Sequence, residues 1–162
     1  MKIRFSIPGN PTAQKRHRTT RRGEHNIQYD PSEGDKADFL SLCMANRPKH
    51  PVEGLVIISM AFWMMIPKGY SNKFKATAEK WDTHLSNKFP TERLDKRFHP
   101  ALAHIKRPDV DNLIKFVLDA LKGVYWKDDT QVQIRCAFKV YSHSPRVELE
   151  IYLEKGEPRG QE

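Results

Sequence analysis

The chain has 162 residues, and its 28 lysines and arginines exceed its 20 aspartates and glutamates, which gives a formal net charge of +8. Apolar residues make up 38% and charged residues 30%, enough for one modest core and too many apolar residues for a wholly disordered chain. No run approaches the ~20 apolar residues of a membrane span, and the amino-terminal segment is not organised as a signal peptide. We therefore expect a cytoplasmic protein with an acidic partner, most often a nucleic acid.

The first part of the chain predicts two strands and one helix around a basic loop. Residues 2–7 alternate apolar and polar side chains, the period of a half-buried strand. Residues 12–26 form the basic loop, and the apolar residues that follow predict a helix that starts near Ser32, a candidate cap, and ends before Pro48. Residues 55–66 are almost continuously apolar, which is typical of a central strand buried on both faces.

The second part of the chain predicts two helices and then two strands. Apolar residues recur every three or four positions in residues 71–87 and again in residues 109–122, which indicates helices. Residues 82–100 include a charged, irregular excursion, and residues 132–141 and 146–153 are typical of strands joined by the tight turn SHSP. The order β, α, β, α, α, β, β predicts one α+β domain over residues 1–154, followed by a flexible tail at 155–162.

Polar residues with chemical potential lie on one side of the predicted helix 109–122. Asp111, Lys115 and Asp119 are four residues apart, so they form a single line along the solvent-facing side. Asp109 and Asn112 belong to the first turn of the same helix. The start of this helix therefore combines two carboxylates, an amide and a lysine.

The length of the following segment suggests that further carboxylates join them. The helix is about 20 Å long, and the six residue steps from Lys122 to Asp128 also cover about 20 Å when extended. If the chain doubles back along the helix, Asp128 and Asp129 arrive level with Asp109 and Asp111. Three or four carboxylates at one end would form the hard-oxygen site that Mg²⁺ or Mn²⁺ prefers.

Structural interpretations of the same residues remain open at this point. Asp109 is also a favourable helix cap, and Asp111 with Lys115 is an ordinary ion pair one helical turn apart. Asp128 and Asp129 also suit a turn before a strand. Carboxylates that face a polyanion need a bridging cation, however, and the net charge of +8 favours a polyanionic partner.

The same segment resembles a known nuclease family. Residues 107–121 (RPDVDNLIKFVLDAL) and 123–132 (GVYWKDDTQV) carry a D-x-D-N pattern, a lysine one turn later, D-A-L at the helix end and paired aspartates. With the opening IPGNP, the basic loop and the closing strands, they resemble the RusA family of Holliday-junction resolvases, endodeoxyribonucleases common in phages and prophages. The resemblance covers most of residues 1–154 and implies a small mixed sheet packed by helices, a homodimer, and a bacterial host cell.

The resemblance also implies roles for individual residues. The essential acids of the family fall on Asp109, Asp111 and Asp129, and its essential lysine falls on Lys115, while Asp128 is a weaker candidate ligand. These carboxylates would hold one or two Mg²⁺ ions, with Mn²⁺ as a substitute, and the metal would activate a water molecule for attack on the phosphodiester. Lys115 would contact the scissile phosphate or position the water.

Several further residues are expected to assist without binding the metal. Asn112 would orient a carboxylate or a water molecule next to the metal, although it also suits helix capping. The cations expected to contact DNA are Lys15, Arg16, Arg18, Arg21 and Arg22 of the basic loop together with Lys106 and Arg107. The basic loop has no aromatic residues between its cations, so it suits contact with the DNA backbone better than base stacking.

The resulting hypothesis is an Mg²⁺-dependent enzyme that resolves Holliday junctions by paired, symmetric phosphodiester hydrolysis in DNA recombination and repair. A junction with two-fold symmetry needs two cuts, which a homodimer with one site per chain would make. Two alternatives remain: another nuclease of branched DNA, such as a flap or fork enzyme, or a junction-binding protein without catalysis. The charged excursion at residues 82–100 leaves the substrate preference open.

Overall fold

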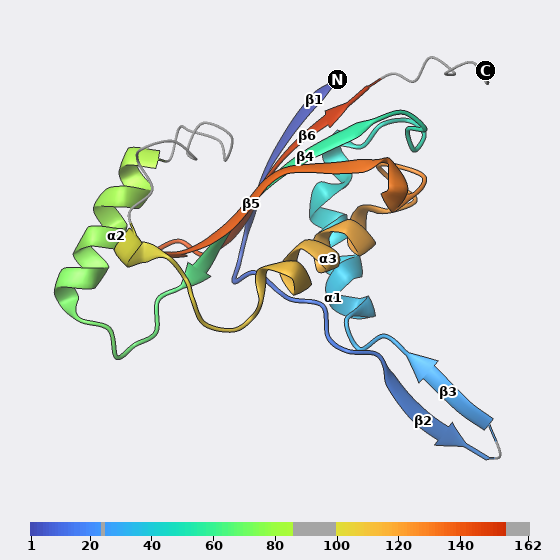
Figure 1. Cartoon of the computed structure of the whole chain (residues 1–162), viewed down its shortest axis with the longest axis horizontal. Coiled ribbons are helices and arrows are strands. Elements are labelled where there is room, and N and C mark those ends of the chain that lie inside the picture. Colours follow the sequence, from blue (N-terminus) through green and yellow to red (C-terminus); the bar gives the residue numbers. More distant parts are fainter. Residues whose placement is uncertain (24, 86–99, 155–162) are drawn as a thin grey trace.

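The four longest strands form one mixed sheet in the order β1–β6–β4–β5 (Figure 1). The computed structural model describes residues 1–23, 25–85 and 100–154. The strands are β1 (Lys2–Pro8), β2 (Arg18–Arg22), β3 (His25–Tyr29), β4 (Val56–Met65), β5 (Val132–Ser142) and β6 (Arg146–Leu153). The helices are α1 (Glu33–Cys43), α2 (Asn72–Leu85) and α3 (Val110–Leu121), with short 3₁₀ helices at Met44–Asn46, Pro100–Leu102 and Asp129–Gln131.

The expected central strand is confirmed as β4. It pairs in parallel with β5 on one side and antiparallel with β6 on the other, and its residues are almost all buried. Strand β1 pairs antiparallel with β6 and buries alternate residues, as the period of two in residues 2–7 predicts. The predicted helices and strands therefore build a mixed α+β sheet domain packed by three helices.

The pairing of the last two strands differs from the expectation of a closing strand pair. Strands β5 and β6 follow each other along the chain, but β4 lies between them in the sheet. Trp63 of β4 stands opposite Val140 of β5 on one side and Arg146 of β6 on the other. The turn at residues 143–145 therefore crosses the end of β4 and does not close a hairpin.

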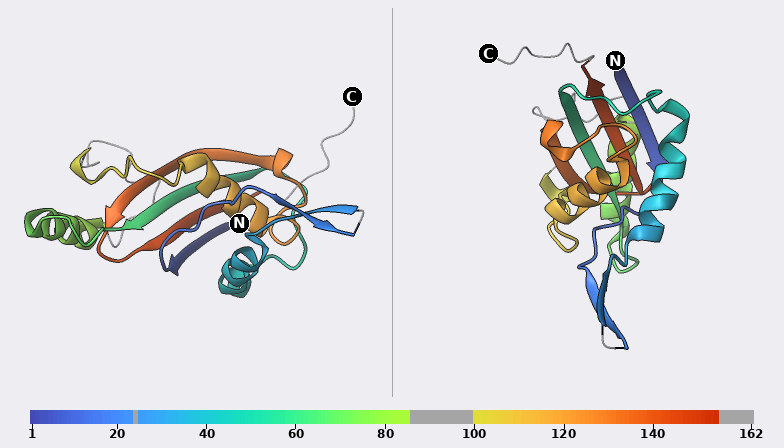
Figure 2. Two further views of the ribbon diagram at one scale, coloured as in Figure 1. Left: turned by 90° about the horizontal axis from the view of Figure 1, so that it is seen from below. Right: turned by 90° about the vertical axis from the view of Figure 1, so that its right-hand side faces the viewer.

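Helices α1 and α3 cover one face of the sheet and create the main core (Figure 2). The apolar stripe of α3 buries Leu113, Phe116 and Val117 against residues of β1, β4 and β6, and Phe39 of α1 packs on Phe116 with ring centroids 5.6 Å apart. Helix α2 lies at the far end of the sheet, where its Trp81 packs in a second, smaller cluster. The polar side of α3 is thereby left facing outward, which presents its charged residues.

The basic segment was predicted as a loop, which residues 12–17 confirm, but from Arg18 onward the chain forms a β-hairpin. Strands β2 and β3 form a separate two-stranded sheet that projects from the domain, and the side chains of all ten strand residues are exposed (Figure 1). Ser32 occupies the N-cap position of α1, as expected, but its hydroxyl accepts a hydrogen bond from the Lys15 backbone N–H at 2.9 Å and makes no capping hydrogen bond to the helix. Ser32 thus ties the base of the hairpin to α1.

Two predicted features lie wholly or largely outside the described residues. Of the charged excursion at 82–100, the structure describes only the end of α2 and the residue that opens the 3₁₀ helix at position 100. The predicted tail at 155–162 is not described. None of the helices in the described ranges is long and apolar enough to cross a membrane.

Candidate active site

The segment that leads into α3 is fastened to strand β5. The backbone N–H of His104 donates to the carbonyl of Lys139 at 3.2 Å. The Lys139 ammonium in turn donates to the carbonyls of Lys106 and Pro108. These bonds hold the backbone just before Asp109, the residue at the start of the helix. Lys139 could not be selected from the sequence, because a single lysine within a strand has no distinctive pattern.

The charged residues at the start of α3 point to solvent without protein partners. Asp109 occupies the cap position, but its side chain makes no capping hydrogen bond. Asp109, Asp111 and Lys115 are exposed, and within residues 1–23, 25–85 and 100–154 none of their side chains has a hydrogen-bond or ion-pair partner. The structural interpretations of Asp109 as a cap and of Asp111 with Lys115 as an ion pair are therefore not realised.

The third acid of the predicted line has a structural role. The carboxylate of Asp119 accepts a hydrogen bond at 2.9 Å from the Lys36 ammonium, which also donates to Asp30 at 2.7 Å. Partial burial alone would raise the pKa of Asp30, but hydrogen bonds from Lys36, Ser32 and Gln14 outweigh it and hold the pKa well below its usual range. Lys36 thus joins α1, α3 and the base of the hairpin.

The paired aspartates lie beside the other end of α3. The Lys122 ammonium is 2.9 Å from one carboxylate oxygen of Asp128 and 3.7 Å from one of Asp129. The other oxygen of Asp128 accepts from the backbone N–H of Thr130, which together with Lys122 lowers the pKa of Asp128 to about 2. Asp129 accepts a hydrogen bond from the Trp126 indole N–H at 2.9 Å.

The prediction that the four acids gather at one end of the helix is therefore wrong for a single chain. Residues 122–127 are not extended: Gly123 adopts a positive φ of 78°, its N–H donates to the Trp126 carbonyl at 2.7 Å, and Tyr125 and Trp126 are buried. Helix α3 separates its two ends by about 17 Å. Within the described part of the chain no three side chains of His, Cys, Asp or Glu are close enough to hold one metal ion.

The predicted DNA-contacting cations flank this site on two sides. Lys106 and Arg107 are exposed just before Asp109, and the Lys106 ammonium lies 5.7 Å from the centre of the Tyr70 ring. On the other side, the backbone N–H of Gln14 donates to the Asn112 carbonyl at 2.9 Å. The segment that leads into the hairpin therefore contacts the first turn of α3. The Asn112 side chain is only partly exposed.

The five cations of the predicted basic loop differ in their contacts. Lys15 forms an ion pair with Asp35 at 2.9 Å, and Arg21 donates to the Gly23 carbonyl at 3.3 Å. Arg16, Arg18 and Arg22 are exposed and have no hydrogen-bond or ion-pair partner among the residues that the structure describes. The basic segment therefore keeps three of its predicted cations available for an anionic partner, and two of them, Arg18 and Arg22, lie on strand β2 of the hairpin.

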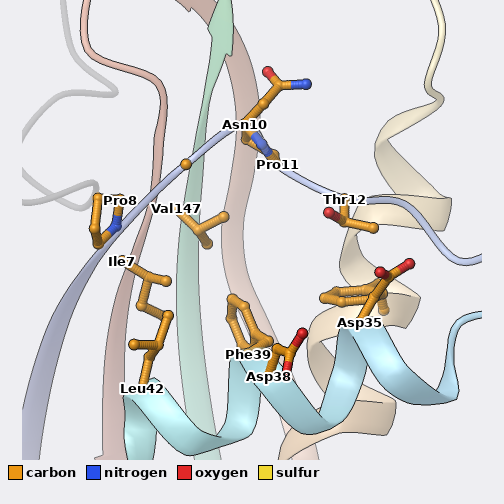
Figure 3. A pocket seen from close by; sticks show the side chains of 12 residues that line it. Ile7, Pro8, Asn10, Pro11, Thr12, Asp35, Asp38, Phe39, Leu42 and Val147 are labelled. Carbon is orange, nitrogen blue, oxygen red and sulfur yellow. The ribbon is translucent and has the colours of Figure 1, made fainter.

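A pocket lies apart from this site, between α1 and the segment after β1 (Figure 3). It has a volume of about 220 Å³, an apolar lining that includes Ile7, Phe39 and Val147, and two carboxylates, Asp35 and Asp38. None of the predicted site residues lines it. Its carboxylates would repel a phosphate, so the pocket does not suit the bound strand of a nucleic acid.

Comparison with known proteins decides the family. The family described as "Endodeoxyribonuclease RusA" matches residues 8–152. The chain belongs to the RusA family. It is also 32% identical over 151 residues to "Uncharacterized protein YqaN" of Bacillus subtilis (strain 168), an alignment that covers 92% of this chain and 94% of that protein. As a RusA-family protein, the chain is a Holliday-junction endodeoxyribonuclease, a hydrolase that acts on DNA in recombination.

Proposed function

We propose that this RusA-family enzyme cuts four-way junctions by Mg²⁺-dependent hydrolysis and that Asp109 and Asp111 are metal ligands. The observation that supports this role is the pair of exposed carboxylates at the start of α3, which have no partner among the described residues and lie next to the cations Lys106 and Arg107. Acids in a folding role are usually paired or hydrogen-bonded, as Asp119 and Asp128 are. The free carboxylates are instead available to a cation.

The chemistry of these donors fits Mg²⁺. Mg²⁺ is held through one or two carboxylates and completes its coordination with water and substrate phosphate oxygens, and Mn²⁺ accepts the same ligands. When bound, the ion would supply charge neutralisation and a reactive water for phosphodiester hydrolysis. Lys115 lies one turn after Asp111 and would place a fixed positive charge against the scissile phosphate. Asn112, in the same turn, would orient an adjacent carboxylate.

A homodimer would account for both the paired cuts and the position of Asp129. One two-fold axis that sets α3 helices antiparallel would bring the carboxyl end of one helix toward the start of the other. Asp129 of a second copy would then complete the carboxylates of Asp109 and Asp111. The Trp126 indole N–H binds one oxygen of Asp129, and the Lys122 ammonium is 3.7 Å from the other, a longer contact than the 2.9 Å and 3.0 Å contacts of the two Asp128 oxygens. Asp129 is therefore the better candidate ligand of the two.

The substrate also suggests where the enzyme works. Junction DNA arises where chromosomes and phage genomes recombine, so we infer that the site of action is the cytoplasm of a bacterial cell, including cells that carry a phage or prophage. The relative from Bacillus subtilis supports a bacterial setting.

The test is cleavage of an end-labelled synthetic four-way junction by the full chain in Mg²⁺, in Mn²⁺ and in EDTA, beside flap, fork and linear duplex substrates. We expect paired, symmetric nicks in Mg²⁺, no cleavage in EDTA, and loss of cleavage with retained junction binding for Asp109→Asn. Asp38→Asn is the control, since Asp38 is an exposed aspartate of α1 outside the site. Tight binding without cleavage in either metal, or faster cleavage of flaps, would contradict the proposal.

A further inference from the structure

The β2–β3 hairpin has two chemically different faces. Because residues directly opposite in an antiparallel pair share a face, the register Arg18↔Tyr29, Thr20↔Ile27 and Arg22↔His25 places these six residues on one side, here named the cationic-apolar face. The opposite face carries Thr19, Arg21, Asn26 and Gln28. Neighbouring arginines 21 and 22 therefore point to opposite sides of the same hairpin.

The cationic-apolar face combines free charge with exposed apolar surface. Arg18, Arg22 and His25 have no hydrogen-bond or ion-pair partner among the described residues, whereas Arg21 on the other face bonds to the Gly23 carbonyl. Ile27 is 41% exposed and Tyr29 is 43% exposed, both large for apolar side chains on a structured element. An isolated two-stranded hairpin is marginally stable in water, so a partner that covers this face would also stabilise the hairpin.

We propose that the cationic-apolar face is the surface with which the hairpin engages junction DNA. The face of Arg21 points away from the DNA in this proposal, which removes Arg21 from the DNA contacts expected from the sequence. Arg18 and Arg22 contact phosphates, while Tyr29 and Ile27 contact sugars and the exposed base faces at the branch. The two-stranded hairpin has the width that the major groove of DNA admits, about 12 Å. This inference rests on the proposed junction-cutting function and names the part of the hairpin that holds the substrate.

The charge of the face favours DNA over a second copy of the chain. The face holds two arginines, a histidine and no acidic residue, and the chain itself has a net charge of +8. Two such surfaces repel each other, whereas a DNA backbone attracts them. The basic segment has no aromatic residue between its cations, but the pairing of β2 with β3 brings Tyr29 opposite Arg18 and so adds an aromatic side chain to this face.

Hydrogen bonds connect the base of the hairpin to the candidate site. DNA bound by the hairpin would therefore lie close to that site. Gln14 is bonded through its backbone to Asn112 and through its side-chain amide to Asp30 at 3.0 Å. Asp30 is in turn bonded to Lys36, which reaches Asp119 of α3. Both ends of α3 therefore have contacts to the base of the hairpin.

The experiment compares neighbouring residues of opposite faces in the full chain. Binding of a fluorescent four-way junction and of a linear duplex is measured in EDTA over a range of salt concentrations. Log affinity falls as log salt rises, and we expect Arg22→Ala to make this slope shallower by about 0.9, because one phosphate contact is lost. Arg21→Ala should leave the slope unchanged. Tyr29→Ala should weaken junction binding about tenfold or more with little change of slope, and Gln28→Ala should not.

A gain-of-charge pair guards against variants that only unfold the hairpin. Thr20→Arg adds a cation to the cationic-apolar face and should strengthen junction binding, whereas Thr19→Arg on the other face should not. Equal effects of the paired substitutions would overturn the proposal, and so would a fall in sedimentation mass for Tyr29→Ala, which would assign the face to a second copy. Because binding is measured in EDTA, failure of the metal-dependent cleavage would leave this result readable.

Discussion

The two ends of helix α3 carry the same residue types and use them in opposite ways. At the carboxyl end, Lys122 and Asp128 bind each other, and Asp119 is bound by Lys36. At the amino end, Asp111 and Lys115 have no partner in the described part of the chain. The charges at the carboxyl end are paired within the fold, whereas those at the amino end are available to a ligand. Contacts therefore separate the acids with a structural role from the candidate metal ligands, which residue type alone does not.

The largest effect is expected at the amino end. Asp111→Asn should lower the rate of junction cleavage about 10²-fold or more, because a candidate metal ligand loses its charge. The free energy of unfolding should change by less than about 0.5 kcal/mol, since the carboxylate is exposed and none of the residues that the structure describes pairs with it. Single-turnover cleavage and thermal melting of Asp111→Asn and of the control Asp38→Asn measure both. A loss of stability that equals the loss of activity would assign Asp111 to the fold.

Lys115 should matter almost as much and in a different way. Lys115→Met should lower cleavage about 10²-fold while junction affinity in EDTA changes little, because its charge is needed at the reacting phosphate. The control is Lys127→Met, an exposed lysine paired with Glu53 at 3.1 Å. If Lys115→Met weakens binding and leaves the cleavage rate of the bound complex intact, Lys115 is an ordinary DNA-contacting residue.

Lys139 of strand β5 holds the backbone in front of the amino end of α3. Lys139→Met removes the donor to two carbonyls in front of Asp109, and we expect about 1–3 kcal/mol of lost stability together with roughly tenfold slower cleavage. Lys139→Arg should recover part of both, since it can still donate to both carbonyls. The concentration of Mg²⁺ at half-maximal rate should also rise, and an unchanged Mg²⁺ requirement would limit Lys139 to a structural role.

Lys36 tests the partnered half of α3. Lys36→Met leaves Asp30 and Asp119 without their cation, so we expect about 1–3 kcal/mol of lost stability, measured by denaturant unfolding at neutral pH. The pKa of Asp30 lies below its unfolded value, so its stabilisation is complete above about pH 4 and fades as the pH falls toward the folded pKa. The difference between wild type and Lys36→Met should therefore shrink on acidification, and a difference that grows would contradict this assignment.

Asp128 should give the smallest effect. Asp128→Asn breaks an exposed ion pair with Lys122, and such pairs contribute little, so junction cleavage should stay within about twofold of wild type. With the pKa of Asp128 lowered to about 2, its small stabilisation is present above the unfolded pKa and is lost as pH falls toward 2. Melting curves of the two proteins should converge over that range. A large loss of cleavage would place Asp128 among the ligands.

Local patterns were enough to predict most of the elements of the fold but not all of their pairing. The periods of residues 2–7 and of residues 109–122 predicted β1 and α3, because burial of one face depends on local spacing. That β4 lies between β5 and β6 could not be predicted, since strand order depends on distant contacts. The hairpin was missed because residues 18–22 and 25–29 bury no face and so have no alternation of apolar residues.

The candidate site was predictable in part for the same reason. Asp109, Asp111 and Lys115 follow from helical spacing, which is local. The position of Asp129 does not follow from local spacing, because the chain turns at Gly123 after Lys122 and does not extend back along the helix. The aromatic residues 125 and 126 were the available signal, since large aromatic side chains are usually buried and pull the chain into the core. The RusA-family assignment identifies the type of enzyme, but the positions of these residues come from the structure.

Mixing two inactive variants tests most directly whether the two ends of α3 meet across a dimer. Asp111→Asn and Asp129→Asn proteins are unfolded together, refolded and assayed on a labelled four-way junction in Mg²⁺. We expect each variant alone to be inactive and the mixture to regain cleavage on one strand, because one of the two composite sites in each mixed dimer is intact. A mixture that stays inactive although mixed dimers form, or an Asp129→Asn protein that cleaves like wild type, would contradict a shared site.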